Sequence, residues 1–380
     1  MTTKNVQEVL DETKLTAISP RFVKRPEQYL QAGDILVSSA NSWNLVGKVS
    51  FVPSLPYKAT AGGFISILRA EPGKADPRYV YRWLASGEVQ HQARACARQT
   101  TNIANLDRTR FLNLQIPLPP LLEQRRIAAI LDKADAVRRK RQQTLDLADQ
   151  FLRSAFLDMF GERIRSAFEG TLAHGWTALL IDEIKTPGAW SCAGGPFGSR
   201  LTRLDYTDPP GVPVIRGSNL SSADGDFSED GFVFVSDAKA EELARNTARP
   251  GDLVVTQRGT LGQVARIPLD ARFPLYVISQ SQMKLTVDQT LADPDYVVWY
   301  LRSPIPAREL AARVLATGVP HINLGILKTL RVVLPPIESQ RRFGRLVLAH
   351  KATRRRLAGG LALAAAQQRA LVSLAFSGGL

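Results

Sequence analysis

Two stretches of the chain are rich in side chains that can hydrogen-bond to nucleic-acid bases. Arg, Asn, Gln, Ser and Thr carry donors and acceptors that match base edges. In the later stretch the candidates for DNA contact are Arg200, Arg203, Arg216, Asn219, Gln257, Arg258, Thr260, Ser279, Gln280, Ser281 and His321. The earlier stretch offers Ser38, Asn41, Asn44, Lys48, Thr100, Thr101 and Asn102. For any single residue a solvated loop side chain is an equally good interpretation, so the prediction rests on the two sets.

An aromatic side chain lies within the earlier set. Trp43 can stack on a base, but packing in the core is the expected role. The polar neighbours therefore carry the DNA-binding hypothesis in this stretch.

Motifs that could support catalysis are weak in this sequence. Residues 208–211 read DPPG, which lacks the aromatic of an amino-methyltransferase loop and predicts a proline turn. Residues 194–199 read GGPFGS, without the Lys-Ser/Thr ending of a phosphate-binding loop. We interpret this turn as one that lets backbone approach DNA, with a purely structural turn nearly as good. The cysteines Cys96 and Cys192 and the four scattered histidines show no metal-ligand spacing. The chain is expected to be non-catalytic, with no bound metal or cofactor of its own.

Positive charge is concentrated in two segments. The net charge of +14 favours a polyanionic partner such as nucleic acid. Residues 121–160 hold eight Lys and Arg against six Asp and Glu, whereas residues 337–376 hold eight against one. Each segment carries one basic cluster: Arg138, Arg139, Lys140 and Arg141 in the first, and Arg354, Arg355 and Arg356 in the second. Our hypothesis is that these clusters contact DNA phosphates, the alternative being a solvated helix face.

The chain contains one unit used twice. The strand-like run at residues 33–38 recurs at 251–256, Asp76-Pro77 recurs as Asp293-Pro294, and Gln124-Arg125-Arg126 recurs as Gln340-Arg341-Arg342. The offset stays between 216 and 218 residues, which chance would not maintain.

Each copy is predicted to begin with strands and end with a long helix. Apolar runs after Gly-Asp turns predict strands at residues 34–38 and 253–256, with further strands at 48–52, 64–68, 263–267 and 282–287. Short helices are expected at 77–84 and 294–302, and polar loops at 99–105 and 317–323. A last strand, at 114–117 in the first copy and at 330–334 in the second, leads into a double proline. The predicted fold class is therefore mixed α/β, with two repeated domains.

The long helices are expected to pair. Residues 118–161 and 336–380 each carry an apolar stripe at helical spacing, and about forty residues form a rod of roughly 60 Å. Such stripes pack as an antiparallel coiled coil, which would place the two domains at opposite ends. Gly359 and Gly360 predict a kink or a close approach. The predicted domains are 1–117 and 162–335, with helices at 118–161 and 336–380.

The two copies are unequal. About forty residues, 174–216, have no counterpart in the first copy, where Asn5-Val6 aligns with Asn219-Leu220. Either the first domain is trimmed, or the natural start lies upstream of Met1.

The quoted residues resemble a known family. The segment LPPLLEQRRIAAILDKAD at 118–135, the repeated Gly-Asp strand, GGPFGSRL at 194–201 and VIRGSN at 214–219 are similar to the specificity (S) subunit of type I restriction–modification systems. The resemblance covers nearly the whole chain, and the proline-to-helix segment is its most specific part. It implies two target-recognition domains that each read half of a split double-stranded DNA sequence, and two helices that act as spacer.

The resemblance also implies partners. Two methyltransferase (M) subunits would dock on the helices, restriction (R) subunits would join through them, and S-adenosylmethionine would be bound by the M subunit for adenine methylation. The polar N-terminus and the lack of a long apolar run predict a cytoplasmic protein. Two alternatives are a stand-alone DNA-binding regulator that dimerises through its helices and a self-contained restriction enzyme. The internal repeat disfavours the first alternative, and the lack of nuclease or methyltransferase motifs disfavours the second.

Overall fold

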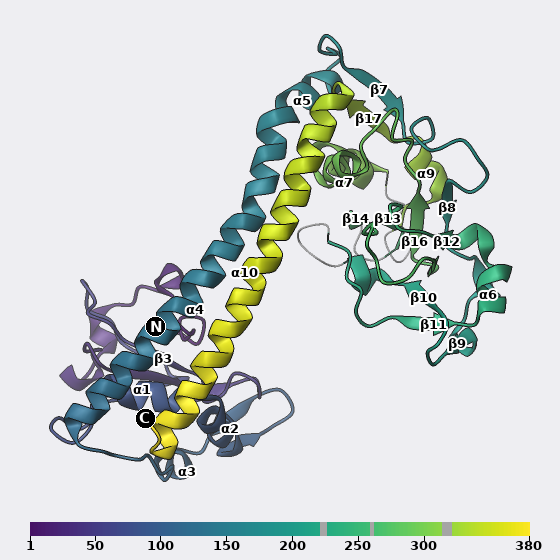
Figure 1. The fold of residues 1–380 in the computed structure, drawn as a ribbon. Helices are drawn as coiled ribbons and strands as arrows, with labels where there is room; N and C mark the ends of the chain where they lie inside the picture. Colours follow the sequence, from purple (N-terminus) through teal and green to yellow (C-terminus); the bar gives the residue numbers. More distant parts are fainter. Residues whose placement is uncertain (221–225, 259–261, 314–320) are drawn as a thin grey trace. The chain divides into compact units, whose positions relative to one another are not determined.

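The structure is a computed structural model that describes residues 1–220, 226–258, 262–313 and 321–380. Two compact units make up the chain (Figure 1): the first is Met1–Gln142 with Gly359–Leu380, and the second is Gln143–Ala358. Each unit contains a globular part and a portion of both long helices. Thr260 and the first part of the predicted loop at 317–323 lie outside the described residues.

The first unit is built on a small antiparallel sheet. Its strands, in the order β3-β1-β4, are β3 (Val49–Phe51), β1 (Ile35–Ser38) and β4 (Ile65–Leu68), all predicted from sequence. Every residue of β1 is buried because both faces of the sheet are covered. Helix α1 (Pro77–Leu84) covers one face, and Met1, Val6 and Leu10 pack on the other. The irregular chain before β1 includes the short turns η1 (Glu12–Lys14), η2 (Pro20–Phe22) and η3 (Pro26–Gln28).

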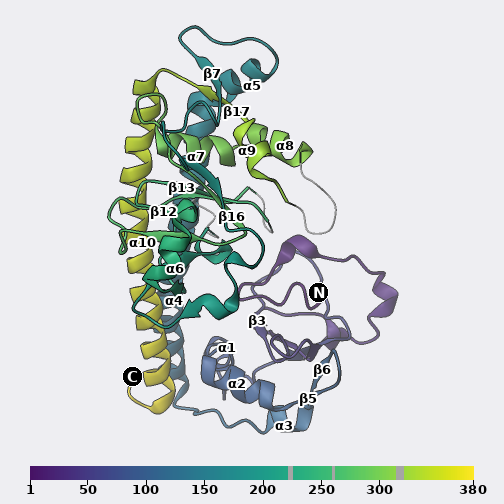
Figure 2. The same cartoon turned by 90° about the vertical axis from the view of Figure 1, so that its right-hand side faces the viewer.

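A second small sheet completes this unit. It has the order β2-β6-β5, with β2 (Ala40–Asn41), β6 (Ala104–Leu106) and β5 (Ala97–Gln99). Helix α2 (Gly87–Ala95) leads into β5, and α3 (Arg108–Leu112) follows β6 (Figure 2). The polar loop expected at 99–105 is therefore the tip of a β5–β6 hairpin.

The second unit contains larger sheets. One has the order β14-β13-β16-β8, formed by β14 (Val264–Arg266), β13 (Leu253–Thr256), β16 (Gln282–Leu285) and β8 (Cys192–Gly194). The other has the order β12-β15-β10-β11-β9, formed by β12 (Thr247–Ala248), β15 (Tyr276–Ile278), β10 (Val212–Ile215), β11 (Val233–Val235) and β9 (Tyr206–Thr207). Ile215, Ala248 and Tyr276 pack against Val254 and Ala265, so the two sheets share a core.

Helices and a two-stranded sheet surround these strands. Helix α7 (Pro294–Arg302) packs on β14 (Figure 1), as α1 packs on β3 in the first unit. Strand β7 (Thr177–Leu180) pairs with β17 (Arg331–Leu334). The remaining elements are α6 (Asp237–Glu242), α8 (Pro304–Ala312), α9 (Leu324–Lys328), η5 (Gly198–Arg200), η6 (Arg203–Asp205), η7 (Gly217–Leu220) and η8 (Ala244–Asn246).

The repeat seen in the sequence is reproduced in hydrogen bonds. The Gln124 side chain accepts from the Asp76 N–H at 2.8 Å, and Gln340 accepts from the Asp293 N–H at 2.9 Å. Both aspartates cap the helix that follows them. The Tyr79 hydroxyl donates to the Pro117 carbonyl, as the Tyr296 hydroxyl donates to Val333. These matched contacts fix the short helix of each unit to the start of the long helix that follows.

The long helices pair within each unit. They are α4 (Leu121–Phe156) and α10 (Ile337–Ser377). In the first unit Ile127 and Leu131, near the start of α4, pack with Ala375 near the end of α10. In the second unit Phe156, at the end of α4, packs edge-on against Phe343 near the start of α10, at 5.3 Å between ring centroids. The helices therefore run antiparallel in both units, which confirms the predicted fold class.

The first long helix continues beyond its predicted end. After α4 the chain forms a π-helical turn, η4 (Leu157–Gly161), and then α5 (Glu162–Phe168). Phe160 in the π turn is buried against Phe156, Tyr296 and Trp176. Gly161 has helical backbone angles and does not end the helix, because this aromatic cluster stabilises the turn around it.

The glycines of α10 mark close approaches. The Arg141 guanidinium donates to the Gly360 carbonyl, and a Cβ at Gly360 would lie 2.8 Å from Arg141 Nη1. A Cβ at Gly344 would lie 2.9 Å from the Asp293 carboxylate. The close approach predicted near Gly359 and Gly360 is confirmed. At Gly344 the absence of a side chain leaves room for Asp293, the residue that caps α7.

One predicted strand is wrong. Residues 114–117 are not a strand, although the equivalent β17 is. Strand β17 is hydrogen-bonded to β7, and β7 has no counterpart in the described part of the first unit. Without a partner strand, the equivalent apolar segment of the first unit does not form a strand.

Candidate nucleic-acid interface

The sheets of the second unit bring several predicted residues to one edge. Because β13 and β16 are antiparallel, the end of β13 lies beside the start of β16, with Thr256 opposite Gln282. The Gln257 N–H donates to the Ser281 carbonyl at 2.7 Å, and the Gln257 carbonyl accepts from Ile322 at 3.0 Å. Arg258 forms a bridge with His321. Residues from three distant segments therefore meet at this edge, with Arg258 exposed and Gln257 half-buried.

The glycine-rich turn after β8 reaches the same edge. The Gly195 N–H donates to the Gln282 carbonyl at 2.8 Å, and a Cβ at Gly195 would lie 2.0 Å from the Ser279 carbonyl oxygen. Only glycine permits this backbone contact. The turn therefore approaches protein backbone at Gly195, whereas the sequence interpretation assigned its backbone approach to DNA.

Three predicted residues of this region hold the loops in place. The Gln280 amide donates to the carbonyls of Gly198 and Leu201, the latter at 3.0 Å. One Arg216 guanidinium nitrogen donates to the Gly231 carbonyl at 2.6 Å. Asn219 is fully buried and bonds to Arg216, Ser228 and Asp230. Asn219 is thus corrected from a DNA contact to a structural residue, because its amide is saturated and shielded from solvent.

Two arginine side chains beside these anchors are exposed, whereas the Ser279 hydroxyl donates to the Gln282 side chain. Arg200 and Arg203 are exposed, and Ser279 and Ser281 are half-buried. The Arg200 guanidinium donates to the Glu242 carbonyl at 3.1 Å. The exposed guanidinium groups retain donors that match base edges and phosphates.

In the first unit the end of β1 is equivalent to the end of β13, and fewer elements surround it. Ser38 ends β1, as Thr256 ends β13, but its side chain is buried and accepts from Asn41 at 3.1 Å. Its assignment as a DNA contact is therefore corrected to a structural role. Lys48 donates to the Gln7 side chain, and Asn41 is half-buried.

The exposed members of the first set lie on neighbouring loops. Asn41 pairs with Ala104 in the small sheet, so the loop after β2 and the β5–β6 hairpin tip start from adjacent positions. That tip carries Thr100, Thr101 and Asn102, and the loop after β2 carries Asn44; all four are exposed. Trp43 is 40% exposed, so its predicted core packing is wrong, and it is accessible to stack on a base.

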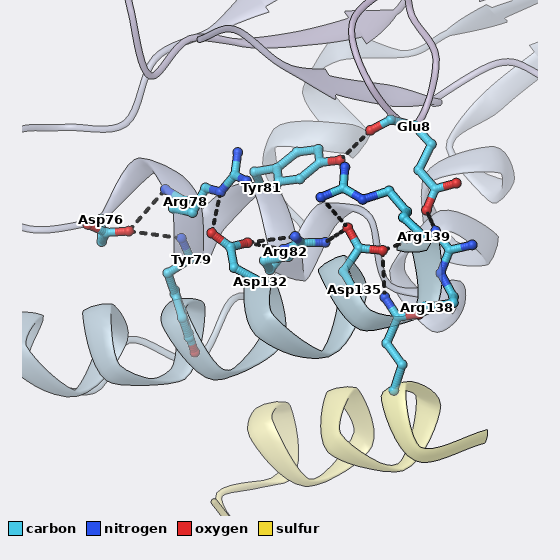
Figure 3. Close-up of polar contacts among 11 residues, drawn as sticks. Glu8, Asp76, Arg78, Tyr79, Tyr81, Arg82, Asp132, Asp135, Arg138 and Arg139 are labelled. Atoms are coloured by element: carbon cyan, nitrogen blue, oxygen red, sulfur yellow. Dashed lines mark hydrogen bonds and ion pairs between the residues drawn. The ribbon is translucent and has the colours of Figure 1, made fainter. Parts of the chain in front are cut away.

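The first basic cluster is engaged in ion pairs (Figure 3). Asp135 is buried and bonds to Arg82 at 3.0 Å and to Arg138 at 3.0 Å, while Arg139 lies 3.5 Å away. Arg138 also pairs with Glu8. Arg138 thus binds the N-terminal segment to α4, and Asp135 joins the cluster to Arg82 of α1, a role that the sequence interpretation did not foresee.

Asp132 extends this network along the same helix. It pairs with Arg78 at 2.7 Å and with Arg82 at 2.6 Å, and Arg82 is only 8% exposed. Burial raises the pKa of Asp135, but the nearby guanidinium groups outweigh it, so its pKa is lowered. Sequence spacing gave no signal for these pairs, because Arg78 and Arg82 precede their partners by about fifty residues.

The second basic cluster is only partly engaged in this way. Arg354 pairs with Asp149 at 2.6 Å and with Asp226 at 3.6 Å. Arg355 and Arg356 are exposed. The phosphate-contact hypothesis is therefore narrowed to Arg355 and Arg356.

Groups that can bind metals or act as nucleophiles could support catalysis. Within the described ranges, no group of three or more His, Cys, Asp and Glu side chains is placed to hold a metal ion. Both cysteines are buried, and burial raises the pKa of the Cys192 thiol to about 11. A thiol with a raised pKa is a poor nucleophile at neutral pH. No helix in the described part of the chain is long and apolar enough to cross a membrane.

Comparisons with known proteins agree with this arrangement. Residues 6–146 match the family described as the type I restriction modification DNA specificity domain. The chain is 23% identical over 341 residues to the putative type I restriction enzyme MjaX specificity subunit of Methanocaldococcus jannaschii, covering 87% of this chain and 75% of the relative. It is 25% identical over 358 residues to the type I restriction enzyme EcoKI specificity subunit of Escherichia coli, covering 87% and 70%.

A solved structure supports the fold. A chain in a structure on complex assembly and conformational transition of the type I R-M system superposes with a TM-score of 0.55 and 20% identity. The match covers 94% of this chain and 85% of that one. The family resemblance inferred from the sequence is therefore confirmed.

Proposed function

We propose that the chain is the DNA sequence-specificity subunit of a type I restriction–modification complex. Each unit reads one half of a bipartite double-stranded target, and the paired helices serve as the spacer. The observation that carries this proposal is the repeated edge: the equivalent strands β1 and β13 both lead into exposed polar side chains, Asn44 in the first unit and Arg258 in the second. The relatives are named specificity subunits, which supports recognition rather than catalysis by this chain.

Partner subunits would supply the chemistry. S-adenosylmethionine would be bound by a methyltransferase subunit, and the specificity subunit would position that enzyme over an adenine. Two methyltransferase subunits match the two-fold repeat, and restriction subunits would join through them. The stand-alone regulator has no comparable support, because the relatives are named parts of restriction enzymes. A cytoplasmic location remains a prediction.

The helix pair offers a place for a methyltransferase subunit. In the first unit a groove of about 570 Å³ lies between α4 and α10, lined mainly by apolar side chains. Val137 and Leu374 line it and are 48% and 46% exposed. Exposed apolar surface along a helix pair is the kind of surface that a partner helix buries.

Co-purification tests this docking site. Val137→Lys should reduce recovery of the methyltransferase subunit by at least tenfold, because a charge would face the apolar partner. Leu348→Lys, at an exposed apolar position of α10 in the second unit, is the matched control for adding charge to a helix. Wild-type recovery with Val137→Lys would refute the groove as a docking site.

A further inference from the structure

The loop between β8 and β9 of the second unit displays two apolar side chains. Phe197 is 84% exposed and Leu204 is 96% exposed, more than any other large apolar side chain among the described residues. Two exposed arginines, Arg200 and Arg203, lie between them in the sequence. A single exposed leucine is ordinary on a protein surface, but a pair on one anchored loop beside arginines is a pattern that needs a cause.

The middle residue of the loop, Leu201, anchors the loop to the five-stranded sheet. Leu201 is 4% exposed and packs with Val214, Val235 and Val277 of the five-stranded sheet. Asp205 accepts from the Thr202 N–H at 2.7 Å and pairs with Lys239 at 3.1 Å. These contacts fix the backbone on both sides of Arg203 and Leu204.

The start of the loop is held by the neighbouring strand ends. The Gln280 amide donates to the Gly198 and Leu201 carbonyls, and Gly195 lies directly against the Ser279 backbone. Gly198 has a φ of +60°, which glycine adopts without strain. Phe197 is therefore displayed where the loop is fixed to Gln280, and Leu204 is displayed further along the same loop, after its buried anchor Leu201.

The chemistry of a DNA groove suits this combination. In the major groove, guanine offers two acceptors to arginine, and the thymine C5-methyl is the apolar group on a base edge. Burial of a Phe or Leu side chain is stabilising, and the chain alone does not obtain this stabilisation at these positions.

We propose that Phe197 and Leu204 contact thymine methyl groups in the half-site read by the second unit. The inference rests on the proposed function and adds two specificity-determining residues that the sequence interpretation did not select. This loop belongs to the second unit, so the proposal concerns the half-site that the second unit reads.

Selection from a randomised DNA duplex library tests the proposal. The full chain, assembled with its methyltransferase partner, is compared with the variants Phe197→Ala and Leu204→Ala. Each variant should lose the base preference at one or two thymine positions of one half-site and keep the other half-site unchanged. Leu269→Ala is the matched control, because Leu269 is 70% exposed and packs near Gly251 at the opposite end of β13.

Deoxyuridine then isolates the methyl group. Replacing the relevant thymine by deoxyuridine should weaken wild-type binding about fourfold, the value of one buried methyl, and should leave the alanine variant unaffected. An unchanged motif in both variants would overturn the proposal. So would a relaxed position that holds no thymine, or equal weakening by deoxyuridine in wild type and variant, which would show that another group contacts the methyl.

Two further outcomes can be distinguished from a failure of this proposal: failure of the proposed function, and failure of a variant to assemble. If the wild-type complex selects no split sequence, the proposed function fails as a whole. If an alanine variant does not assemble, Phe197→Leu and Leu204→Met are compared in the same duplexes, and retention of the thymine preference by these apolar replacements is then required.

Discussion

The two units share one framework but differ in what surrounds it. In both, an asparagine accepts from the N–H three residues before it and donates to a downstream carbonyl: Asn5 to Asp11, and Asn219 to Ser228. The residues that follow, Val6 and Leu220, pack on the same face of the central sheet. Ahead of Asn219 stand the strands β8, β9 and β10 of the second unit. These strands pack beside a framework that both units share.

The units also differ in how they are fastened to the helices. The first uses an exchange of charges, in which Asp132 and Asp135 of α4 bind Arg78 and Arg82 of α1. The second has Asp295 at the position of Arg78, and this aspartate pairs with Arg266 inside its own unit. Its contact with the helices is aromatic, through Phe156, Phe160, Tyr296 and Phe343. Both copies thus pack on the helices through buried apolar side chains, and the first copy adds ion pairs that the second lacks at the equivalent position.

The largest expected effect comes from breaking the ion pairs between α1 and α4. Asp135→Asn leaves Arg82 buried without its full charge partner and should destabilise the first unit by about 3 kcal/mol. Hydrogen exchange over residues 76–84 should rise, with no change over 294–302. Equal exchange in both segments would contradict the assignment of this network to the first unit.

A smaller effect is expected where a glycine of the second unit meets its capping aspartate. Gly344→Ala places a Cβ 2.9 Å from the Asp293 carboxylate and should cost about 2 kcal/mol. The first unit has Ala128 at the equivalent position, so Ala128→Gly should cost only about 1 kcal/mol of helix propensity. Denaturant unfolding of both variants measures the difference. A stabilising Gly344→Ala would show that α7 can shift freely along α10.

The capping aspartate itself should give a pH-dependent effect of opposite sign to Asp135. Burial raises the pKa of Asp293, so its stabilising contribution is complete below about pH 3.8 and is lost as pH rises through the raised pKa. Asp293→Asn keeps the cap and should be neutral or stabilising by up to about 1 kcal/mol at pH 7. The lowered pKa of Asp135 makes its contribution present above about pH 3.8 and lost on further acidification. Thermal unfolding from pH 3 to pH 7 distinguishes the two signs.

The smallest effect concerns the two basic clusters. Replacing Arg355 and Arg356 by Ala should reduce the slope of log affinity against log salt by about 0.9 for each phosphate that is no longer neutralised. Replacing Arg139 by Ala should leave that slope unchanged, because its guanidinium already lies near Asp135. A salt titration of DNA binding by both variants makes the comparison. Identical slopes for the two variants would remove the distinction between the clusters.

Local patterns predicted most of the framework. The strands β1, β3, β4, β13, β14 and β16 and the helices α1 and α7 follow from apolar periodicity, turn residues and the repeat. The strand expected at 114–117 failed because strand formation requires a partner, which local sequence does not reveal. The distant partners of the basic cluster at 138–141 could not be predicted for a similar reason, since Glu8 and Gly360 meet it only after folding.

Residue type identified the candidates for DNA contact, but it did not indicate which of these side chains are accessible to solvent. Ser38 and Asn219 have suitable side chains but are buried by the strand end and the turn that they stabilise. Phe197 and Leu204 have types that favour the core and are nonetheless exposed, because Leu201 between them takes the buried position.

Methylation sequencing of cells that carry the chain with its partner subunits tests the central claim most directly. Our account predicts a split motif with two fixed halves, modified on both strands. Replacing Gln257 and Arg258 by Ala should alter one half only, and replacing Asn44 and Asn102 by Ala should alter the other half only. A continuous motif, or a motif in which either pair of replacements changes both halves, would contradict the assignment of one unit to each half-site.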